Sequence, residues 1–115
     1  MLRRTLIKFL IASSLSIFTS SLLANDENLI EVWKSPTCGC CKDWIIHLES
    51  NGFKVVYYDT GNNRVRHQVG MPRKYGSCHT AIIGDYVIEG HVPASDIFKL
   101  IDLQSKAIGL SVPGM

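Results

Sequence analysis

Apolar and polar positions along the chain predict a β-α-β-(α)-β-β-α order of elements. Residues 29–34 are mostly apolar and β-prone, which is typical of a buried strand. The next segment has the i, i+3, i+4, i+7 spacing of an apolar helix face. The residues at this spacing are Cys41, Trp44, Ile45 and Leu48. Gly52 predicts the end of that helix, and residues 53–58 predict a second strand.

The second half of the chain predicts a short helix, a hairpin and a further helix. Residues 64–69 are the short helix, and residues 80–83 and 86–89 are strands joined by a Gly-Asp turn. Pro93 predicts the start of the last helix. Its apolar face consists of Ala94, Ile97, Phe98 and Ile101. Residues 107–115 predict an irregular tail.

This order predicts an α/β fold of the thioredoxin-like class. Two strands joined by a helix should be parallel, and the later hairpin is antiparallel by construction. The result is a mixed four-stranded sheet with flanking helices. The roughly 75 residues from 29 to 103 suffice for one such sheet covered by helices.

Residues 1–24 are interpreted as a secretory signal peptide. Arg3, Arg4 and Lys8 form a positive start, a serine-interrupted apolar stretch follows, and Ala24 offers a small residue for cleavage. The paired arginines also fit a twin-arginine signal, so the export route stays open. An uncleaved N-terminal anchor is the alternative. After cleavage we expect no stable membrane association.

Residues 25–115 then form one domain, because 115 residues in total are too few for two. The whole chain has 12 basic and 10 acidic residues, a net charge of +2. Without the signal peptide 9 basic residues face 10 acidic ones. Such a balance provides no basic face for nucleic acid.

All four cysteines lie after the signal peptide, where an oxidising compartment would favour disulfides. They are Cys38, Cys40, Cys41 and Cys78. Three of them fall within four residues, which is a poor arrangement for tying down a loop and a good one for a redox or metal centre. A structural disulfide with a spare cysteine is the plainer alternative.

Cys38 lies at the start of the first predicted helix, where unpaired N–H groups and the helix dipole favour a thiolate. We therefore expect it to be the exposed, acidic thiol. Cys41, one turn later, can pair with it as in thiol–disulfide oxidoreductases. Cys40 adds a third thiol, which favours a soft metal site instead. Cu(I) binds thiolate, imidazole and thioether ligands.

Other candidate ligands lie far away in sequence. Cys78 and His79 precede the third strand, whose start faces the first helix in a thioredoxin-like sheet, and His91 follows the fourth strand at the same edge. We expect these three to converge on the cysteine turn. Met71 and Met115 are weaker thioether candidates, because a lone methionine more often packs in a core.

The other two histidines, His47 and His67, are interpreted as solvated surface residues.

Four motifs in order resemble the CopG-type copper-resistance family of Gram-negative bacteria, formerly a domain of unknown function. They are the Trp-Lys-Ser-Pro-Thr-Cys-Gly-Cys-Cys, Ser-Cys-His-Thr-Ala, Glu-Gly-His-Val-Pro-Ala and Gly-Leu-Ser-Val-Pro-Gly-Met segments. The resemblance implies a periplasmic thioredoxin-like protein that binds copper through a CxCC motif. Copper handling or conversion between Cu(I) and Cu(II) is the role it implies.

The matching positions are Cys38, Cys40 and Cys41 for the CxCC motif, Cys78 and His79 for the Cys-His pair, and His91. Six such donors exceed the three or four that one Cu(I) needs, so we predict a small copper cluster or a ligand set that changes with oxidation state. Expected partners are copper ions and other periplasmic copper-handling proteins. A thiol–disulfide oxidoreductase using Cys38 and Cys41 and a structural zinc module are the alternatives, and whether the protein turns over as an enzyme stays open.

Overall fold

The computed structural model describes residues 28–113. The predicted signal peptide, residues 1–24, and Met115 lie outside the described residues. Within residues 28–113, none of the helices combines the length and the apolar character that crossing a bilayer requires.

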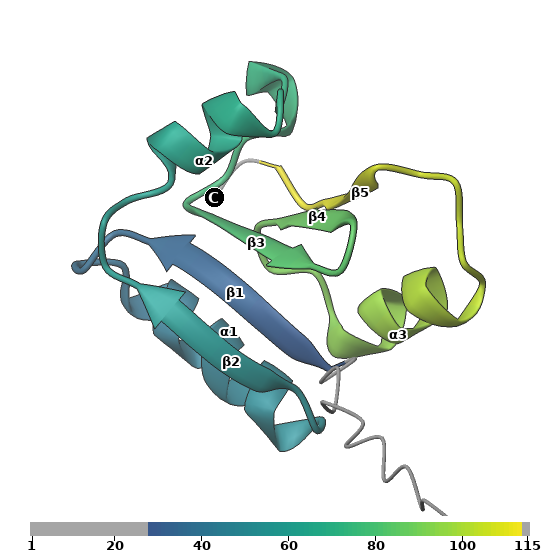
Figure 1. The fold of residues 1–115 in the computed structure, drawn as a ribbon. Coiled ribbons are helices and arrows are strands. Elements are labelled where there is room, and N and C mark those ends of the chain that lie inside the picture. Colours follow the sequence, from purple (N-terminus) through teal and green to yellow (C-terminus); the bar gives the residue numbers. More distant parts are fainter. Residues whose placement is uncertain (1–27, 114–115) are drawn as a thin grey trace, which may run out of the picture.

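A five-stranded mixed sheet forms the centre of the fold, in the order β2-β1-β3-β4-β5 (Figure 1). Its strands are β1 Leu29–Lys34, β2 Lys54–Tyr58, β3 His79–Ile83, β4 Tyr86–Glu89 and β5 Gly109–Ser111. The helices are α1 Gly39–Ser50, α2 Asn63–Gln68, the short 3-10 helix η1 Arg73–Tyr75, and α3 Ala94–Asp102. β1 pairs with β2 in parallel and with β3 antiparallel. The predicted α/β class and element order are confirmed.

The predicted number of four strands is wrong by one, because part of the tail forms β5. This strand pairs in parallel with β4, and hydrogen bonds from Val87 N–H to Ile108 O and from Val112 N–H to Glu89 O flank the ladder. Gly109 makes the pairing possible, since a Cβ at this position would lie 1.7 Å from Val87 O. Three residues with a glycine and a nearby proline carry no local strand pattern, so only tertiary pairing forms this strand.

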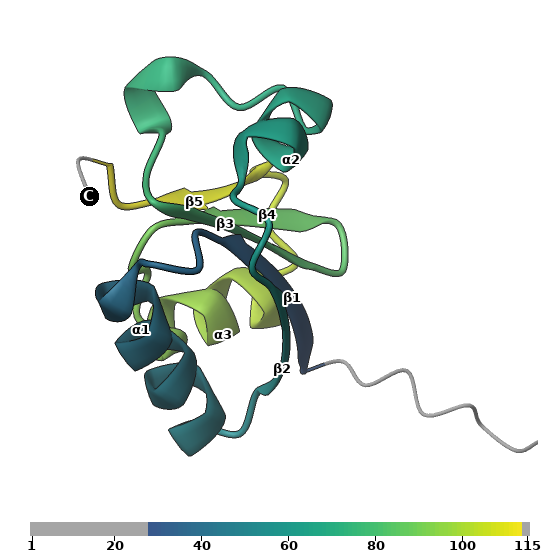
Figure 2. The same cartoon turned by 90° about the vertical axis from the view of Figure 1, so that its left-hand side faces the viewer.

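The helices lie on both sides of the sheet. α1 and α3 cover one face, whereas α2 and η1 lie on the other (Figure 2). The predicted apolar face of α1 is confirmed, because Cys41, Trp44, Ile45 and Leu48 are all buried. Trp44, Ile45 and Leu48 pack with Ile30, Val32, Ala81, Ile88 and Ile97 in the main core. On α3 the buried residues are Ala94, Ile97 and Leu100, while Phe98 and Ile101 are only partly buried.

The strand pairing brings three segments to one end of the sheet. β1 ends at Lys34, and the chain turns through Cys38 into α1. Because β3 is antiparallel to β1, its first residue His79 pairs with Lys34. β4 returns antiparallel to β3 and ends at Glu89, opposite Thr80. The segment that follows β4 therefore lies beside the start of β3 and the N-terminus of α1.

Candidate metal centre

Four sulfur atoms lie together at the N-terminus of α1. Cys38 and Cys41 form a disulfide, with their Cα atoms 5.5 Å apart. The Sγ of Cys40 lies 3.3 Å from that of Cys38, and the Sγ of Cys78 lies 3.3 Å from that of Cys41. All four Sγ atoms are within 4.8 Å of one another. The structure thus brings the distant Cys78 to the cysteine turn, as the topology predicted.

His79 places a ring nitrogen against the sulfurs. Its Nδ1 lies 3.2 Å from Cys41 Sγ and 3.5 Å from Cys78 Sγ, and its Nε2 lies 2.7 Å from Gly90 O. A carbonyl oxygen only accepts, so Nε2 carries the hydrogen and Nδ1 presents a lone pair to the sulfurs. A second-sphere carbonyl that fixes the tautomer of a histidine in this way is characteristic of metal ligands.

Burial keeps this imidazole neutral. His79 is fully buried, and this desolvation lowers its pKa from 6.5 to about 4. The hydrogen bond to Gly90 O opposes the shift and the charge of His91 adds to it. At neutral pH the ring is therefore uncharged, which is the form that binds a metal.

Burial also acts on the half-buried thiol next to it. Desolvation raises the pKa of Cys78, opposed by a hydrogen bond from Ser77 and reinforced by the charge of Cys40. An anionic sulfur at this position is costly in the absence of a cation, and a bound metal would supply the missing positive charge.

His91 completes the group but has an unsatisfied nitrogen. Ligand atoms of Cys78, His79 and His91 lie within 4.8 Å of one another, and the rings of His79 and His91 stack at 5.2 Å. The Nε2 of His91 is buried, and among the described residues it has no hydrogen-bond partner. A buried polar atom without a partner costs roughly 1–3 kcal/mol, so its retention here points to a partner from outside the protein.

Two further residues of α1 support the segments that carry His79 and His91, a role that the sequence did not predict. Trp44 stacks on His79 with 4.3 Å between ring centroids, and its Nε1 donates a 2.8 Å hydrogen bond to Val92 O. His47 is exposed as predicted, yet its Nε2 accepts a 3.1 Å hydrogen bond from Ala94 N–H. Both contacts attach α1 to the segment that directly follows His91. Nothing in the local pattern distinguishes them from a core tryptophan and a surface histidine.

The expectation for the exposed thiol is corrected by the structure. Cys38 is half-buried and bonded to Cys41, whereas the exposed free cysteine is Cys40. The reason is that Cys38 is the N-cap residue of α1 and turns toward Cys41, one helical turn away, while Cys40 lies on the solvent side of the first turn.

An open groove of about 440 Å³ reaches the cluster from solvent. Its lining combines side chains of α1 with those of the segment after β4. The residues are Cys40, Asp43, Trp44, His47, His91 and Pro93. An ion that enters the groove would meet the exposed Cys40 and the half-buried His91 before it reaches the buried Cys41 and His79.

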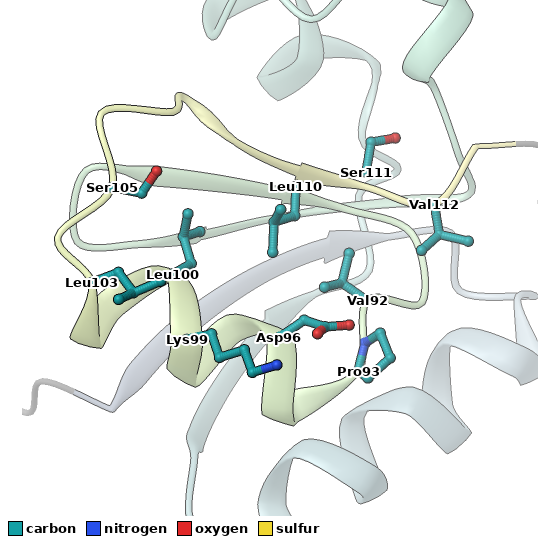
Figure 3. A pocket seen from close by; sticks show the side chains of 10 residues that line it. All are labelled: Val92, Pro93, Asp96, Lys99, Leu100, Leu103, Ser105, Leu110, Ser111 and Val112. Atoms are coloured by element: carbon teal, nitrogen blue, oxygen red, sulfur yellow. The ribbon is translucent and has the colours of Figure 1, made fainter.

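A second cavity of about 340 Å³ lies between α3 and β5. Figure 3 shows leucines from both elements pointing into it. Asp96 and Lys99 are the titratable residues of its lining, and no cysteine or histidine contributes to it. It therefore offers no soft donor for a metal.

Of the two methionine candidates, Met71 is the one that lies among the described residues. Met71 is half-buried in the loop between α2 and η1, on the α2 side of the sheet, and Met115 lies outside the described residues. Their role as thioether ligands stays a prediction. His67 is exposed, as predicted.

The donor set decides what the site can do. Four sulfurs and two imidazoles suit Cu(I) and Zn²⁺, and they are poor ligands for Mg²⁺ or Ca²⁺, which take oxygen. The disulfide between Cys38 and Cys41 at a helix N-terminus is also an arrangement suited to thiol–disulfide exchange. The geometry therefore fits a soft metal centre, a redox centre, or one that combines both.

Comparison with known proteins identifies the family to which the chain belongs. A family described as a protein of unknown function, DUF411, matches residues 75–115. Two solved structures, both named copper resistance protein CopG (Form 1 and Form 2), are each 48% identical to this chain. Each match covers 76% of this chain and 70% of the other, with TM-scores of 0.70 and 0.67. A search of curated protein sequences finds no match. At this identity and coverage, the chain belongs to the family of the copper resistance protein CopG.

Proposed function

We propose that this protein binds Cu(I) in copper resistance or homeostasis, using one centre made of thiolates and imidazoles. The ligands are Cys38, Cys40, Cys41, Cys78, His79 and His91. The observation that carries the proposal is the convergence of these donors, with the buried Nε2 of His91 lacking any partner in residues 28–113. The copper resistance proteins to which the chain is similar support copper as the metal.

The number of donors supports more than one ion. Reduction of the disulfide between Cys38 and Cys41 frees two thiolates, so that four sulfurs within 4.8 Å of one another become available. Thiolates can bridge neighbouring Cu(I) ions, and one Cu(I) needs only three or four ligands. The mixture of ligands also suits interconversion of Cu(I) and Cu(II), because thiolate favours the former and imidazole accepts the latter.

We place this activity in the periplasm. The proposal rests on residues 1–24, which have the positive start and apolar stretch of a signal peptide. Copper ions, and other periplasmic proteins that deliver or receive them, are the partners. The groove at Cys40 and His91 is the route by which copper reaches the buried donors.

A Cu(I) titration of the reduced protein against a chromophoric Cu(I) chelator tests the proposal. We expect more than one Cu(I) per chain, and fewer in Cys40→Ser and in His91→Asn. His67→Asn is the matched control, because His67 is exposed on α2 and should leave the ratio unchanged. Copper-edge X-ray absorption should report sulfur and nitrogen neighbours. Binding of one ion or none, unaffected by Cys40→Ser, would contradict a multi-copper site, and zinc that resists replacement by Cu(I) would favour a structural zinc module.

A second function, thiol–disulfide exchange with other proteins, is favoured by the disulfide between Cys38 and Cys41 at the N-terminus of α1. An insulin-reduction assay on metal-free protein separates it from copper binding. Turnover that survives Cys40→Ser and His91→Asn but not Cys38→Ser would favour this second function. Absence of turnover in the metal-free protein would favour copper binding.

A further inference from the structure

The four sulfurs form one compact group, all within 4.8 Å of one another, rather than two isolated pairs. Cys40 contacts Cys38, Cys38 is bonded to Cys41, and Cys41 contacts Cys78. Cys41 thus has two sulfur neighbours, its disulfide partner and the free thiol of Cys78 at 3.3 Å. That separation falls in the range of roughly 3–3.5 Å typical of reacting atoms held ready for attack.

We infer that Cys78 is a second redox partner of Cys41, so that the disulfide moves within the protein from Cys38–Cys41 to Cys41–Cys78. The sulfur of Cys78 attacks Cys41 Sγ, the new S–S bond forms there, and the bond to Cys38 breaks. The electron pair of the broken bond leaves with Cys38, which takes up the proton that Cys78 gives up. One disulfide and two thiols are present before and after the step, so no outside oxidant or reductant is consumed.

Because Cys41 is buried, only a thiol of the same protein can attack its sulfur. The side chain of Cys41 is fully buried, so a thiol from another protein cannot reach its sulfur, whereas Cys78 contacts it from the start of β3. The Nδ1 of His79 lies 3.5 Å from Cys78 Sγ and 3.2 Å from Cys41 Sγ, so the ring holds the two sulfurs next to each other. The leaving sulfur belongs to Cys38, the N-cap of the 12-residue helix α1, where the helix dipole stabilises a thiolate.

A competing exchange, in which Cys40 attacks Cys38, is less favourable. Cys40 Sγ lies 3.3 Å from Cys38 Sγ, so it could attack Cys38 and release Cys41. The product would join two cysteines separated only by Gly39, a short ring that strains the disulfide. Cys41 and Cys78 are 37 residues apart in sequence and carry no such restriction.

Movement of the disulfide changes which thiols remain free to bind copper. Only this consequence of the inference rests on the proposed function. After the disulfide moves to Cys41 and Cys78, the free thiols are Cys38 and the exposed Cys40, which lines the groove. With His91 on the same groove, these two thiolates and one imidazole would offer the three ligands that one Cu(I) needs. The position of the disulfide would therefore decide whether the exposed Cys40 is joined by Cys78 or by Cys38 as the second free thiol available to copper.

Disulfide mapping of metal-free, once-oxidised protein tests the inference. Trypsin releases the three clustered cysteines in residues 35–42 and Cys78 in residues 75–99. After trapping of free thiols with N-ethylmaleimide, a disulfide between Cys38 and Cys41 gives a looped first peptide, and one between Cys41 and Cys78 gives a cross-linked pair. We expect both products in the native protein, with the cross-link lost in Cys41→Ser.

Two variants, each with one cysteine replaced, identify which sulfur atoms form the cross-link. Cys40→Ser should keep the cross-link. Cys38→Ser should convert nearly all oxidised protein to it, because Cys78 contacts Cys41 at 3.3 Å and a bond between the adjacent Cys40 and Cys41 would close a strained ring. Loss of the cross-link in Cys40→Ser would overturn the inference by showing that the bond forms through Cys40. A cross-link in Cys38→Ser but not in the native protein would also overturn it, since proximity would then exist without exchange.

The mapping is independent of copper. A map without the cross-link beside a normal Cu(I) titration would overturn this inference alone. A map with the cross-link in a protein that binds no Cu(I) would support the exchange and contradict the proposed copper function.

Discussion

Two groups of side chains with polar or sulfur atoms, each built around buried residues, occupy opposite faces of the sheet at the same end of β3. On the α1 face lies the sulfur–imidazole cluster, composed of Cys38, Cys40, Cys41, Cys78, His79 and His91. On the α2 face lies a second group, here called the carboxylate network, composed of Asn62, Arg66, Ser77, Thr80 and Glu89. Alternation along β3 separates them, because His79 points to one face and Thr80 to the other.

The carboxylate of Glu89, at the centre of the carboxylate network, finds hydrogen bonds and an opposite charge within the protein, although Arg66 Nε itself makes no hydrogen bond to another described residue. The carboxylate of Glu89 is fully buried and accepts hydrogen bonds of 2.8 Å from Ser77 N–H and 2.6 Å from Thr80 Oγ1. Arg66 Nε lies 3.5 Å away as the opposite charge, and Asn62 donates to Ser77 O and Thr80 Oγ1. Every group that faces the carboxylate therefore compensates its burial.

The sulfur–imidazole cluster is not satisfied in this way. Its thiols contact mainly one another and His79, and the Nε2 of His91 has no partner within residues 28–113. The difference distinguishes polar groups that stabilise the fold from polar groups that bind a ligand, although both lie at one end of the same sheet. Arg66 Nε lacks a hydrogen bond but faces the opposite charge of Glu89, whereas His91 Nε2 has neither among the described residues. A buried polar atom with neither kind of partner marks the place where a ligand from outside is received.

The largest effect is expected on the carboxylate network. Glu89→Ala removes the acceptor of Ser77 N–H and Thr80 Oγ1 and leaves the charge of Arg66 without its partner. Breaking a buried pair from one side costs about 3–5 kcal/mol of unfolding free energy. Urea unfolding of the metal-free protein measures this loss.

Asp85→Ala is the matched control, because Asp85 is an exposed carboxylate in the turn between β3 and β4. We expect its effect to stay within about 0.5 kcal/mol. If Glu89→Ala does not fold, Glu89→Gln keeps one acceptor oxygen and should lose less stability. A Glu89 variant as stable as the control would show that the network is not structural.

A smaller effect is expected from pH, and the two groups should respond with opposite signs. Burial lowers the pKa of His79 from 6.5 to about 4, so the unfolded chain binds a proton before the folded one does. Stability is then complete above about pH 6.5 and falls by up to about 3 kcal/mol as pH drops toward 4. Burial raises the pKa of Glu89, so the folded carboxyl takes up its proton first and gains stability as pH falls through that folded value.

Unfolding free energies of metal-free protein between pH 8 and pH 4 separate the two contributions. His79→Asn should remove the loss of stability below about pH 6.5, whereas His67→Asn on the exposed side of α2 should keep it. An unchanged pH profile in His79→Asn would mean that a different group controls the acid sensitivity.

The sequence predicted the residues of the sulfur–imidazole cluster better than it predicted the carboxylate network and β5. The face of α1 and the hairpin were predictable because local periodicity determines them, and they brought Cys78 and His79 to the cysteine turn. Glu89 gave no such signal, since a glutamate at the end of an apolar strand has the pattern of a solvent-exposed terminus. Its burial depends on Arg66 and Ser77, which tertiary contacts supply. β5 was missed for the same reason, because its pairing with β4 has no counterpart in local pattern.

His47 provides a test of intermediate size at the edge of the cluster. The N-cap of α3 is Pro93, whose side chain makes no capping hydrogen bond, and His47 Nε2 accepts one from Ala94 N–H instead. His47→Ala should therefore cost about 1 kcal/mol of unfolding free energy, as the loss of a helix cap does. His67→Ala, at another exposed histidine, should cost less. Equal effects of the two substitutions would indicate that the cap contributes nothing.

The smallest change in stability is expected where the largest change in copper binding should occur. Cys78 is half-buried and contacts Cys41 and His79, so Cys78→Ala removes no group on which the backbone depends. Unfolding free energy of the reduced, metal-free protein should change by only about 0.5 kcal/mol, while Cu(I) bound per chain decreases because one shared thiolate is lost. Measured together, Glu89→Ala and Cys78→Ala should show opposite profiles, one unstable and one stable but deficient in copper. If Cys78→Ala destabilised the protein as strongly as Glu89→Ala and left copper binding intact, both groups would be structural and the distinction between the two faces would fail.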